Sequence, residues 1–277
     1  MEEVYGSMQT YAGVSVVNAI PSWYGSSMAI DLKVEVTIEE SKECISHTPL
    51  VDKIVDYFRE YFNIPCLRVN VNSEIPPRSG LKSSSAVSTA LIAEIAKKFD
   101  IKINPAIYSA MLSIMAKVSV TGALDDATAS YFGGVSFTYN KEFKILEVRE
   151  PPELSVILLP YGNRSISINV DEMREFRYLF EEVFNMARKG DIITAMKING
   201  LAVGSILGYD LKPATMALKA GALAAGISGN GPSVFAVTKP GDEGPIIDVF
   251  EQYDNPIVTR VVGICKQRLE DLKYTVL

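Results

Sequence analysis

Histidine is almost absent from this chain: His47 is the only one in 277 residues. A single imidazole excludes His-rich metal sites and argues against a Ser-His-Asp triad. Because His47 lies in a loop-like stretch before Pro49, we expect it to be solvated. Cysteine is also scarce, and Cys44, Cys66 and Cys265 form neither a CxxC pair nor a metal-ligand spacing. We therefore expect reduced cysteines and a cytoplasmic protein.

Positive charge is in deficit as well, with 27 Lys and Arg against 33 Asp and Glu and a net charge of -6. This balance, and the lack of a basic patch interleaved with aromatics, disfavours a nucleic-acid partner. The first residues have neither the basic segment nor the apolar run of a signal peptide. The uncharged run 220–238 is interrupted by glycines and Pro232, so it predicts helix, turn and strand and no membrane span.

What the chain does contain is enough apolar residues, 48%, to form a large core, and its length suggests about two domains. Alternating and continuous apolar runs predict strands over 13–17, 29–38, 67–71, 135–139, 154–159, 234–238 and 258–262. Helical periodicity predicts helices over 50–62, 83–99, 106–117, 171–189, 191–207, 212–224 and from about 245. The elements do not alternate strictly, which indicates an α+β fold. The proline pair near 151 suggests domains over 1–150 and 151–277.

A strand–loop–helix segment carries the first chemical signal. It reads Pro76-Pro77-Arg78-Ser79-Gly80-Leu81-Lys82-Ser83-Ser84-Ser85-Ala86. The first turn of a helix has unpaired N–H groups that favour an anion, usually a phosphate, and glycine permits close backbone approach. Leu81 stands where a Walker A loop needs glycine, so this is not that motif. The alternative is a helix that the serines merely cap.

Two further segments are rich in small residues. Gly122–Ala127 places Asp125 beside Asp126, and such a pair can act as a base or simply cap a helix. Gly226–Ser233 has three glycines in six residues, which predicts a tight turn or a close approach of the backbone to a ligand.

In this order and spacing, the three segments resemble the nucleotide loop, the base-carrying segment and the late glycine loop of the GHMP small-molecule kinases. Within that family, the Gly80–Ala86 loop with lysine at Lys82, the Thr121–Ala127 segment and the N-terminal Ala12-Gly13…Asn18-Ala19-Ile20 resemble the archaeal-type shikimate kinases. The resemblance spans almost the whole chain. It implies a ribosomal S5-like N-terminal domain and a ferredoxin-like C-terminal domain.

The resemblance also implies ATP-dependent phosphorylation of the 3-hydroxyl of shikimate. ATP would bind residues 76–86, with Gly229 and Gly231 closing the site and Ser84 contacting Mg²⁺. Asp125 would accept the proton of the substrate hydroxyl, and Lys82 would supply positive charge to the phosphates. Asn18, Lys117 and Arg164 would contact the substrate, the latter two because a carboxylate needs a cation.

Two departures from the family pattern leave alternatives open. Several relatives have a glutamate, a second magnesium ligand, about eleven residues before the aspartate, whereas Ser113–Ala116 contains no acid. Mevalonate kinase-like relatives also carry an N-terminal lysine near the substrate hydroxyl, whereas no Lys or Arg precedes Lys33 here. Another GHMP kinase, such as a homoserine kinase, or a non-catalytic metabolite sensor of the same fold are the rival interpretations. The oligomeric state is left open.

Overall fold

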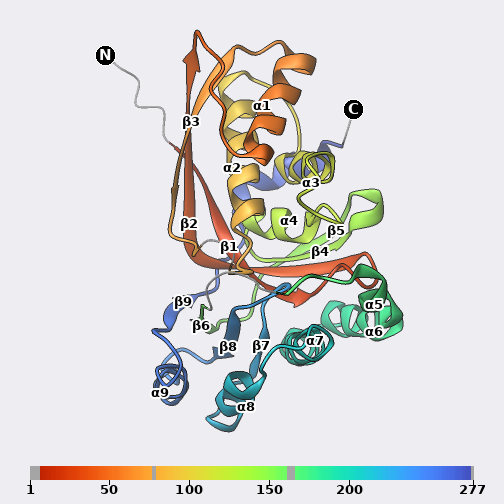
Figure 1. Cartoon of the computed structure of the whole chain (residues 1–277), viewed down its shortest axis with the longest axis vertical. Helices are drawn as coiled ribbons and strands as arrows, with labels where there is room; N and C mark the ends of the chain where they lie inside the picture. Colours follow the sequence, from red (N-terminus) through yellow and green to blue (C-terminus); the bar gives the residue numbers. More distant parts are fainter. Residues whose placement is uncertain (1–6, 77–78, 161–165, 276–277) are drawn as a thin grey trace.

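The computed structural model describes residues 7–76, 79–160 and 166–275, and it contains two antiparallel sheets with helices around them (Figure 1). The larger sheet has the order β1-β2-β4-β5, with β3 also paired to β2. Its strands are β1 (Met8–Val17), β2 (Tyr24–Ser41), β3 (Cys66–Ser73), β4 (Val135–Tyr139) and β5 (Lys144–Arg149). β2 is long enough to pair β1 along one side and β3 and β4 along the other.

The smaller sheet has the order β7-β8-β6-β9, so the first of its strands lies in the middle. Its strands are β6 (Ser155–Leu159), β7 (Ala224–Ile227), β8 (Val234–Thr238) and β9 (Ile257–Arg260). With helices between β6 and β7 and between β8 and β9, this is the ferredoxin-like arrangement.

Four helices cover one face of the larger sheet, as Figure 1 shows: α1 (Pro49–Phe62), α2 (Ser83–Lys98), α3 (Pro105–Met115) and α4 (Leu124–Phe132). The remaining helices are α5 (Val170–Glu175), α6 (Arg177–Arg188), α7 (Ile192–Ile206), α8 (Lys212–Lys219) and α9 (Gly244–Phe250), with 3-10 turns η1 (Asn140–Glu142) and η2 (Lys266–Lys273). α7 packs on both β7 and β1 and so joins the two sheets.

One apolar core runs through both sheets. It includes Val14 and Ile30 of the larger sheet and Leu158 and Phe235 of the smaller one, all fully buried. The strands divide between the sheets near residue 150, yet the segment after β9 returns to the first half of the chain, where Cys265 N donates to Phe132 O. The domain limits 1–150 and 151–277 therefore stay a prediction.

The α+β class and most elements agree with the sequence-based expectation, with local differences. No helix was predicted over the small, acidic segment 122–131, but most of it forms α4. The helix expected over 171–189 is interrupted at Phe176, whose backbone (φ -90°, ψ 14°) leaves helical geometry between α5 and α6. β5 was not predicted, and β7 occupies the end of the helix expected over 212–224. In the described part of the chain, no helix is long and apolar enough to cross a membrane.

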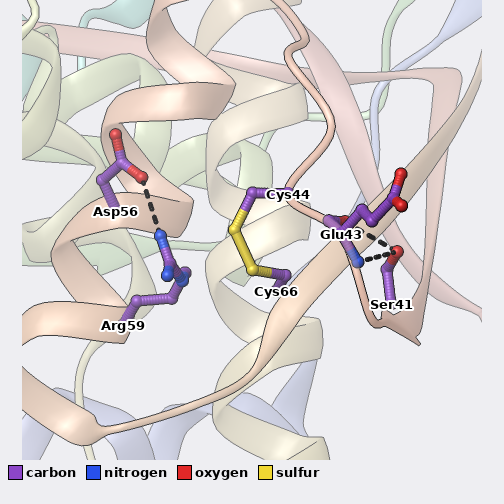
Figure 2. Close-up of a disulfide and its surroundings, with 6 residues drawn as sticks. All are labelled: Ser41, Glu43, Cys44, Asp56, Arg59 and Cys66. Carbon is purple, nitrogen blue, oxygen red and sulfur yellow. Dashed lines mark hydrogen bonds and ion pairs between the residues drawn. A yellow bond between two sulfur atoms is a disulfide. The ribbon is translucent and has the colours of Figure 1, made fainter.

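The cysteine prediction is wrong for two of the three residues. Cys44, after β2, and Cys66, at the start of β3, form a disulfide with a Cα–Cα distance of 5.0 Å (Figure 2). β2 and β3 pair antiparallel, and this brings together cysteines that are 22 residues apart. The cytoplasmic location, which rested partly on reduced cysteines, stays a prediction.

His47 is also not solvated as expected. Its side chain is 15% exposed, and Nε2 accepts a hydrogen bond from the backbone N–H of Val69 at 3.3 Å. Its backbone N–H donates to the Asp52 carboxylate at 2.7 Å. The histidine therefore anchors the loop before α1 to β3.

Candidate active site

The first structural feature of the site is the entry into α2. Lys82 is its N-cap and adopts the left-handed conformation (φ 69°), and its side chain makes no capping hydrogen bond. The serines predicted as possible caps lie instead within the first turn, where Ser84 is exposed. The first-turn N–H groups have no partner within the helix, so this end of α2 can bind an anion.

The glycine loop after β7 packs directly on this entry. Gly80 has φ +82°, and a Cβ there would lie 2.7 Å from Ser228 O and 2.9 Å from Gly231 O. Ser233 N–H donates to Ser79 O at 3.1 Å, and Ser228 Oγ donates to Gly80 O at 3.3 Å. The two glycine-containing segments, about 150 residues apart in the sequence, therefore form one surface. Glycine is required at Gly80 because any side chain would push the loops apart.

The acidic pair lies in the first turn of α4. The N-cap of this helix is Ala123 in the left-handed conformation (φ 52°), so neither Asp125 nor Asp126 caps it. Consecutive helical residues point in different directions, and the two carboxylates accordingly have different surroundings.

Asp126 is held by Lys82. The Lys82 Nζ atom lies 2.9 Å from Asp126 Oδ1 and donates to Ser15 Oγ at 2.7 Å. The hydroxyl of Ser27 donates to the same Asp126 oxygen. With side-chain exposures of 9% for Lys82 and 13% for Asp126, this ion pair is largely withdrawn from solvent. It links the entry of α2 to the first turn of α4.

Asp125 is buried, with 4% exposure. Its Oδ1 accepts a hydrogen bond from Asn140 Nδ2 at 2.9 Å, and its Oδ2 lies 3.4 Å from the Ser27 hydroxyl. Burial, and then the neighbouring Asp126 charge, raise the pKa of Asp125 from 3.8 to about 7, while Lys82 and the Asn140 hydrogen bond act in the opposite direction. A carboxyl with a pKa near neutrality is well suited to general base catalysis.

Two cavities meet at the ion pair. One, of about 190 Å³, is lined by the α2 entry, including Ser84, and by Gly229 of the glycine loop. The other, of about 230 Å³, is lined by Asp125, Asn18 and the segment after α3. Both cavities are lined by Lys82, Asp126, Val118, Ser119, Ala123, Gly229 and Asn230. The geometry thus places an anion-binding helix end beside a chamber that contains a buried carboxyl.

Comparison with known proteins agrees with this architecture. Residues 49–134 match the GHMP kinases N terminal domain, and residues 214–255 match the GHMP kinases C terminal domain. A shikimate kinase of Pyrococcus furiosus is 36% identical over 267 residues, covering 90% of this chain and 96% of that protein. The chain belongs to the GHMP kinase family.

Further relatives fit that assignment. A shikimate kinase of Methanothermobacter thermautotrophicus is 34% identical to this GHMP kinase, covering 95% of the chain and 97% of that protein. The structure of Methanococcus jannaschii mevalonate kinase has a TM-score of 0.73 at 15% identity, covering 94% of this chain and 99% of the other. The structure of a homoserine kinase of Cytophaga hutchinsonii has a TM-score of 0.69 at 17% identity, covering 95% of this chain and 97% of the other. These two structures show that the fold is shared.

The predicted site residues of this GHMP kinase fall into three groups. Asp125, Asn18, Gly229 and residues 79–85, which include Lys82, line the two cavities. Lys117, predicted to contact the substrate, is exposed, and it lines neither cavity; nor do Pro76, Ala86 and Gly231, predicted to bind ATP. Pro77, Arg78 and Arg164 lie outside the described residues. Every predicted binding role stays a prediction.

Asn18 has a structural role beyond the predicted one. Its Nδ2 donates to Gly229 O at 3.2 Å and to Asn230 Oδ1 at 2.7 Å, while its backbone N–H donates to Asn199 Oδ1 at 2.8 Å. The end of β1 is thereby tied to the glycine loop and to α7. Because Asn18 also lines the second cavity, substrate contact is compatible with this role.

Several residues of the site were missed by sequence reasoning. Ser15, Ser27 and Asn140 come from three separate places in the larger sheet and its connections, and none belongs to a glycine-rich segment. A serine or asparagine near a strand end carries no signal of its own in a single sequence. Only the pairing of β1, β2 and β4 brings these residues to the acidic pair.

The described side chains offer few ligands for Mg²⁺, so water and nucleotide phosphates would have to hold most of the ion. Within the described ranges, no group of three or more His, Cys, Asp or Glu side chains is placed to hold a metal ion. Ser84 offers one exposed neutral oxygen beside the anion-binding helix end. Because Mg²⁺ usually keeps several waters and binds substrate phosphates, this donor set fits an ion that arrives with a nucleotide.

Proposed function

We propose that this GHMP kinase transfers the terminal phosphoryl group of ATP to the 3-hydroxyl of shikimate. The observation that carries the proposal is the buried Asp125 carboxyl in a cavity that adjoins the anion-binding entry of α2. Relatives named shikimate kinase, 33–36% identical over most of the chain, support the choice of substrate. A small polyhydroxy acid is also compatible with a cavity of about 230 Å³.

The phosphates of ATP would lie in the first cavity. The first-turn N–H groups of α2 and the positive end of its dipole would face them, and the glycine loop would approach from the other side. Gly80 and Gly229 let the two loops pack closely, so that the glycine loop lies against the α2 entry and Lys82.

The hydroxyl of shikimate would lie in the second cavity, within reach of Asp125. Asp125 would accept the hydroxyl proton as the oxygen attacks the phosphorus in line with the leaving ADP oxygen. Its pKa of about 7 means that the carboxylate form, which is the base, is well populated at neutral and higher pH.

Positive charge at the junction comes from Lys82, the one cation among the described residues that line the two cavities. It would neutralise charge on the transferred phosphoryl group, and its ion pair with Asp126 fixes its position before ATP binds. Mg²⁺ bound with ATP would be contacted by Ser84 and would supply further charge neutralisation.

The decisive experiment measures ADP release by the purified protein with Mg-ATP and shikimate, homoserine, mevalonate or no alcohol. We expect shikimate-dependent ADP release, with the product identified as shikimate 3-phosphate by mass spectrometry. Activity only with homoserine or mevalonate would overturn the substrate and keep the kinase reaction. ATP binding without any turnover would favour a metabolite sensor instead.

A further inference from the structure

A buried asparagine beside the acidic pair donates a hydrogen bond to Asp125 and has no role in the proposed reaction described so far. Asn140 follows β4, is fully buried, and donates from Nδ2 to Asp125 Oδ1 at 2.9 Å. The two residues belong to different elements, so this contact is not part of a local turn. The question is what this side chain does for the carboxyl it touches.

Two buried neighbours agree on the orientation of the Asn140 amide. An ionised carboxylate can only accept hydrogen bonds, so the amide nitrogen faces Asp125, and it also lies 3.4 Å from Thr121 Oγ1. The amide oxygen then accepts the hydrogen bond of the Thr138 hydroxyl at 2.6 Å. Thr138 is itself fully buried on β4, which pairs with β2 beneath the acidic pair.

The described hydrogen bonds of the Asn140 side chain all go to residues outside its own 3-10 turn. Within the turn it is the backbone that bonds, with Phe143 N–H donating to Asn140 O at 3.2 Å, while Asn140 N–H donates to Trp23 O at 2.9 Å. The polar atoms of the side chain are thus directed to Thr138, Asp125 and Thr121. A buried amide with all its groups paired is rigid and holds its neighbours in one geometry.

The carboxyl of Asp125 has two oxygens in unlike positions. Oδ1 is bound by Asn140 at 2.9 Å, whereas Oδ2 accepts a long hydrogen bond of 3.4 Å from the Ser27 hydroxyl. The Ser27 hydroxyl makes a much shorter contact with Asp126, so it has little hold on Oδ2. Oδ2 is therefore the oxygen available to a substrate hydroxyl.

We propose that Asn140, oriented by Thr138, is a positioning residue that holds Asp125 Oδ1 and presents Oδ2 to the substrate hydroxyl. The inference rests on the proposed phosphoryl transfer, and it adds the residue that positions the base. Asn140 acts through Asp125 and does not touch the substrate. A hydrogen bond to a carboxylate also favours its charged form, so Asn140 keeps the base ionised in a buried setting.

Besides the hydrogen bond from Asn140, few charged groups act on the pKa of Asp125. Asp126, on the same helix, raises the pKa of Asp125, and Lys82, from the α2 entry, lowers it. On the β2 and β4 side, the carboxyl faces the uncharged Ser27 and Gly25, and Ser136 bonds the backbone carbonyl of Asp125. Loss of the Asn140 donor should therefore appear as an upward shift in the pKa of the base.

The test uses Asn140→Leu and Thr138→Val, with Thr138→Ser as the matched control that keeps the hydroxyl. In Asn140→Leu the Thr138 hydroxyl still has an acceptor, Gly25 O at 3.3 Å, so no buried donor is left without a partner. We measure kcat against pH with saturating shikimate and ATP, KM for ATP, and thermal unfolding for each variant.

We expect Asn140→Leu to raise the apparent pKa of the acidic limb of kcat by about one unit and to lower kcat at pH 7 roughly tenfold. Thr138→Val should shift the limb in the same direction by less, and Thr138→Ser should resemble the wild type. KM for ATP should change little, because the α2 entry is untouched. An unchanged limb in both variants, with activity that falls only as thermal stability falls, would overturn the inference.

A direct titration separates this inference from the proposed function. The Asp125 carboxyl carbon can be followed by ¹³C NMR in aspartate-labelled protein and assigned with Asp125→Asn. A raised pKa of Asp125 in Asn140→Leu would support the proposed hydrogen bond from Asn140 to Asp125. This would hold even if the wild type phosphorylated no alcohol, and only the proposed function would then fail. An unchanged Asp125 pKa in Asn140→Leu would overturn the inference whatever the substrate.

Discussion

Replacing Asp125 with asparagine should make the protein more stable while it abolishes most of its activity. The Asp125 carboxyl has a pKa of about 7 in the folded protein, because burial and then the adjacent Asp126 disfavour its charge. In the unfolded chain its pKa is near 3.8. The folded state therefore disfavours ionisation, and this group lowers stability progressively as pH rises from about 4 to about 7. Asparagine has the same shape and no charge to bury.

The size of the effect follows from the difference between the two pKa values, about 7 and 3.8, which is about three units. At about 1.4 kcal/mol per unit, the carboxyl reduces the free energy of unfolding by up to about 4 kcal/mol above pH 7. At pH 5, which is only about one unit above the pKa in the unfolded chain, the carboxyl reduces the free energy of unfolding by less than half of that maximum. At pH 4 it is close to zero.

The assay is urea unfolding of wild type and Asp125→Asn at pH 5 and pH 8, with ATP binding and ADP release measured on the same samples. The variant should be more stable at pH 8, and this gain should shrink at pH 5. Its turnover should fall about 10²- to 10⁴-fold with ATP binding retained. Asp126→Asn is the matched control, because it removes the adjacent carboxylate and breaks the Lys82 ion pair. A stability difference independent of pH, or full activity in Asp125→Asn, would refute the reasoning.

Three other changes test the proposed cation, the packing around Asp125 and the disulfide. Lys82→Met should lower kcat at least 100-fold, because the one described cation at the junction is lost, and KM for shikimate should change less; a kcat close to wild type would contradict that role. Gly25→Ala places a Cβ 2.5 Å from Asp125 Cγ, so steady-state assays should show a fall in kcat of roughly tenfold or more with near-native circular dichroism. Cys44→Ser opens the loop closed by Cys66, 22 residues away, and should cost about 3 kcal/mol in urea unfolding without changing kcat.

The parts of the fold and site that could be predicted from sequence are those determined by local patterns. The proline, glycine and serine run before α2 predicts a helix entry, and the apolar stripe that follows predicts the helix itself. The adjacent Asp125 and Asp126 stand out because a pair of carboxylates among small residues is unusual. Each of these signals lies within about ten residues.

The parts that could not be predicted depend on contacts between distant segments. Lys82 pairs with Asp126 only because α2 and α4 pack on the same face of the larger sheet. Asn140 reaches Asp125 through the pairing of β2 with β4, and Cys44 reaches Cys66 through the pairing of β2 with β3. No spacing in a single sequence encodes these registers.

The surroundings of the two adjacent carboxyls favour Asp125 over Asp126 as the proposed base. Asp126 Oδ1 is held by the Lys82 ammonium and the Ser27 hydroxyl, so this carboxylate positions the cation. Asp125 instead lines the second cavity, and one of its oxygens is bound by the uncharged Asn140. Asp126 also raises the pKa of Asp125, so in the proposed reaction one carboxylate would position the cation and the other would receive the proton.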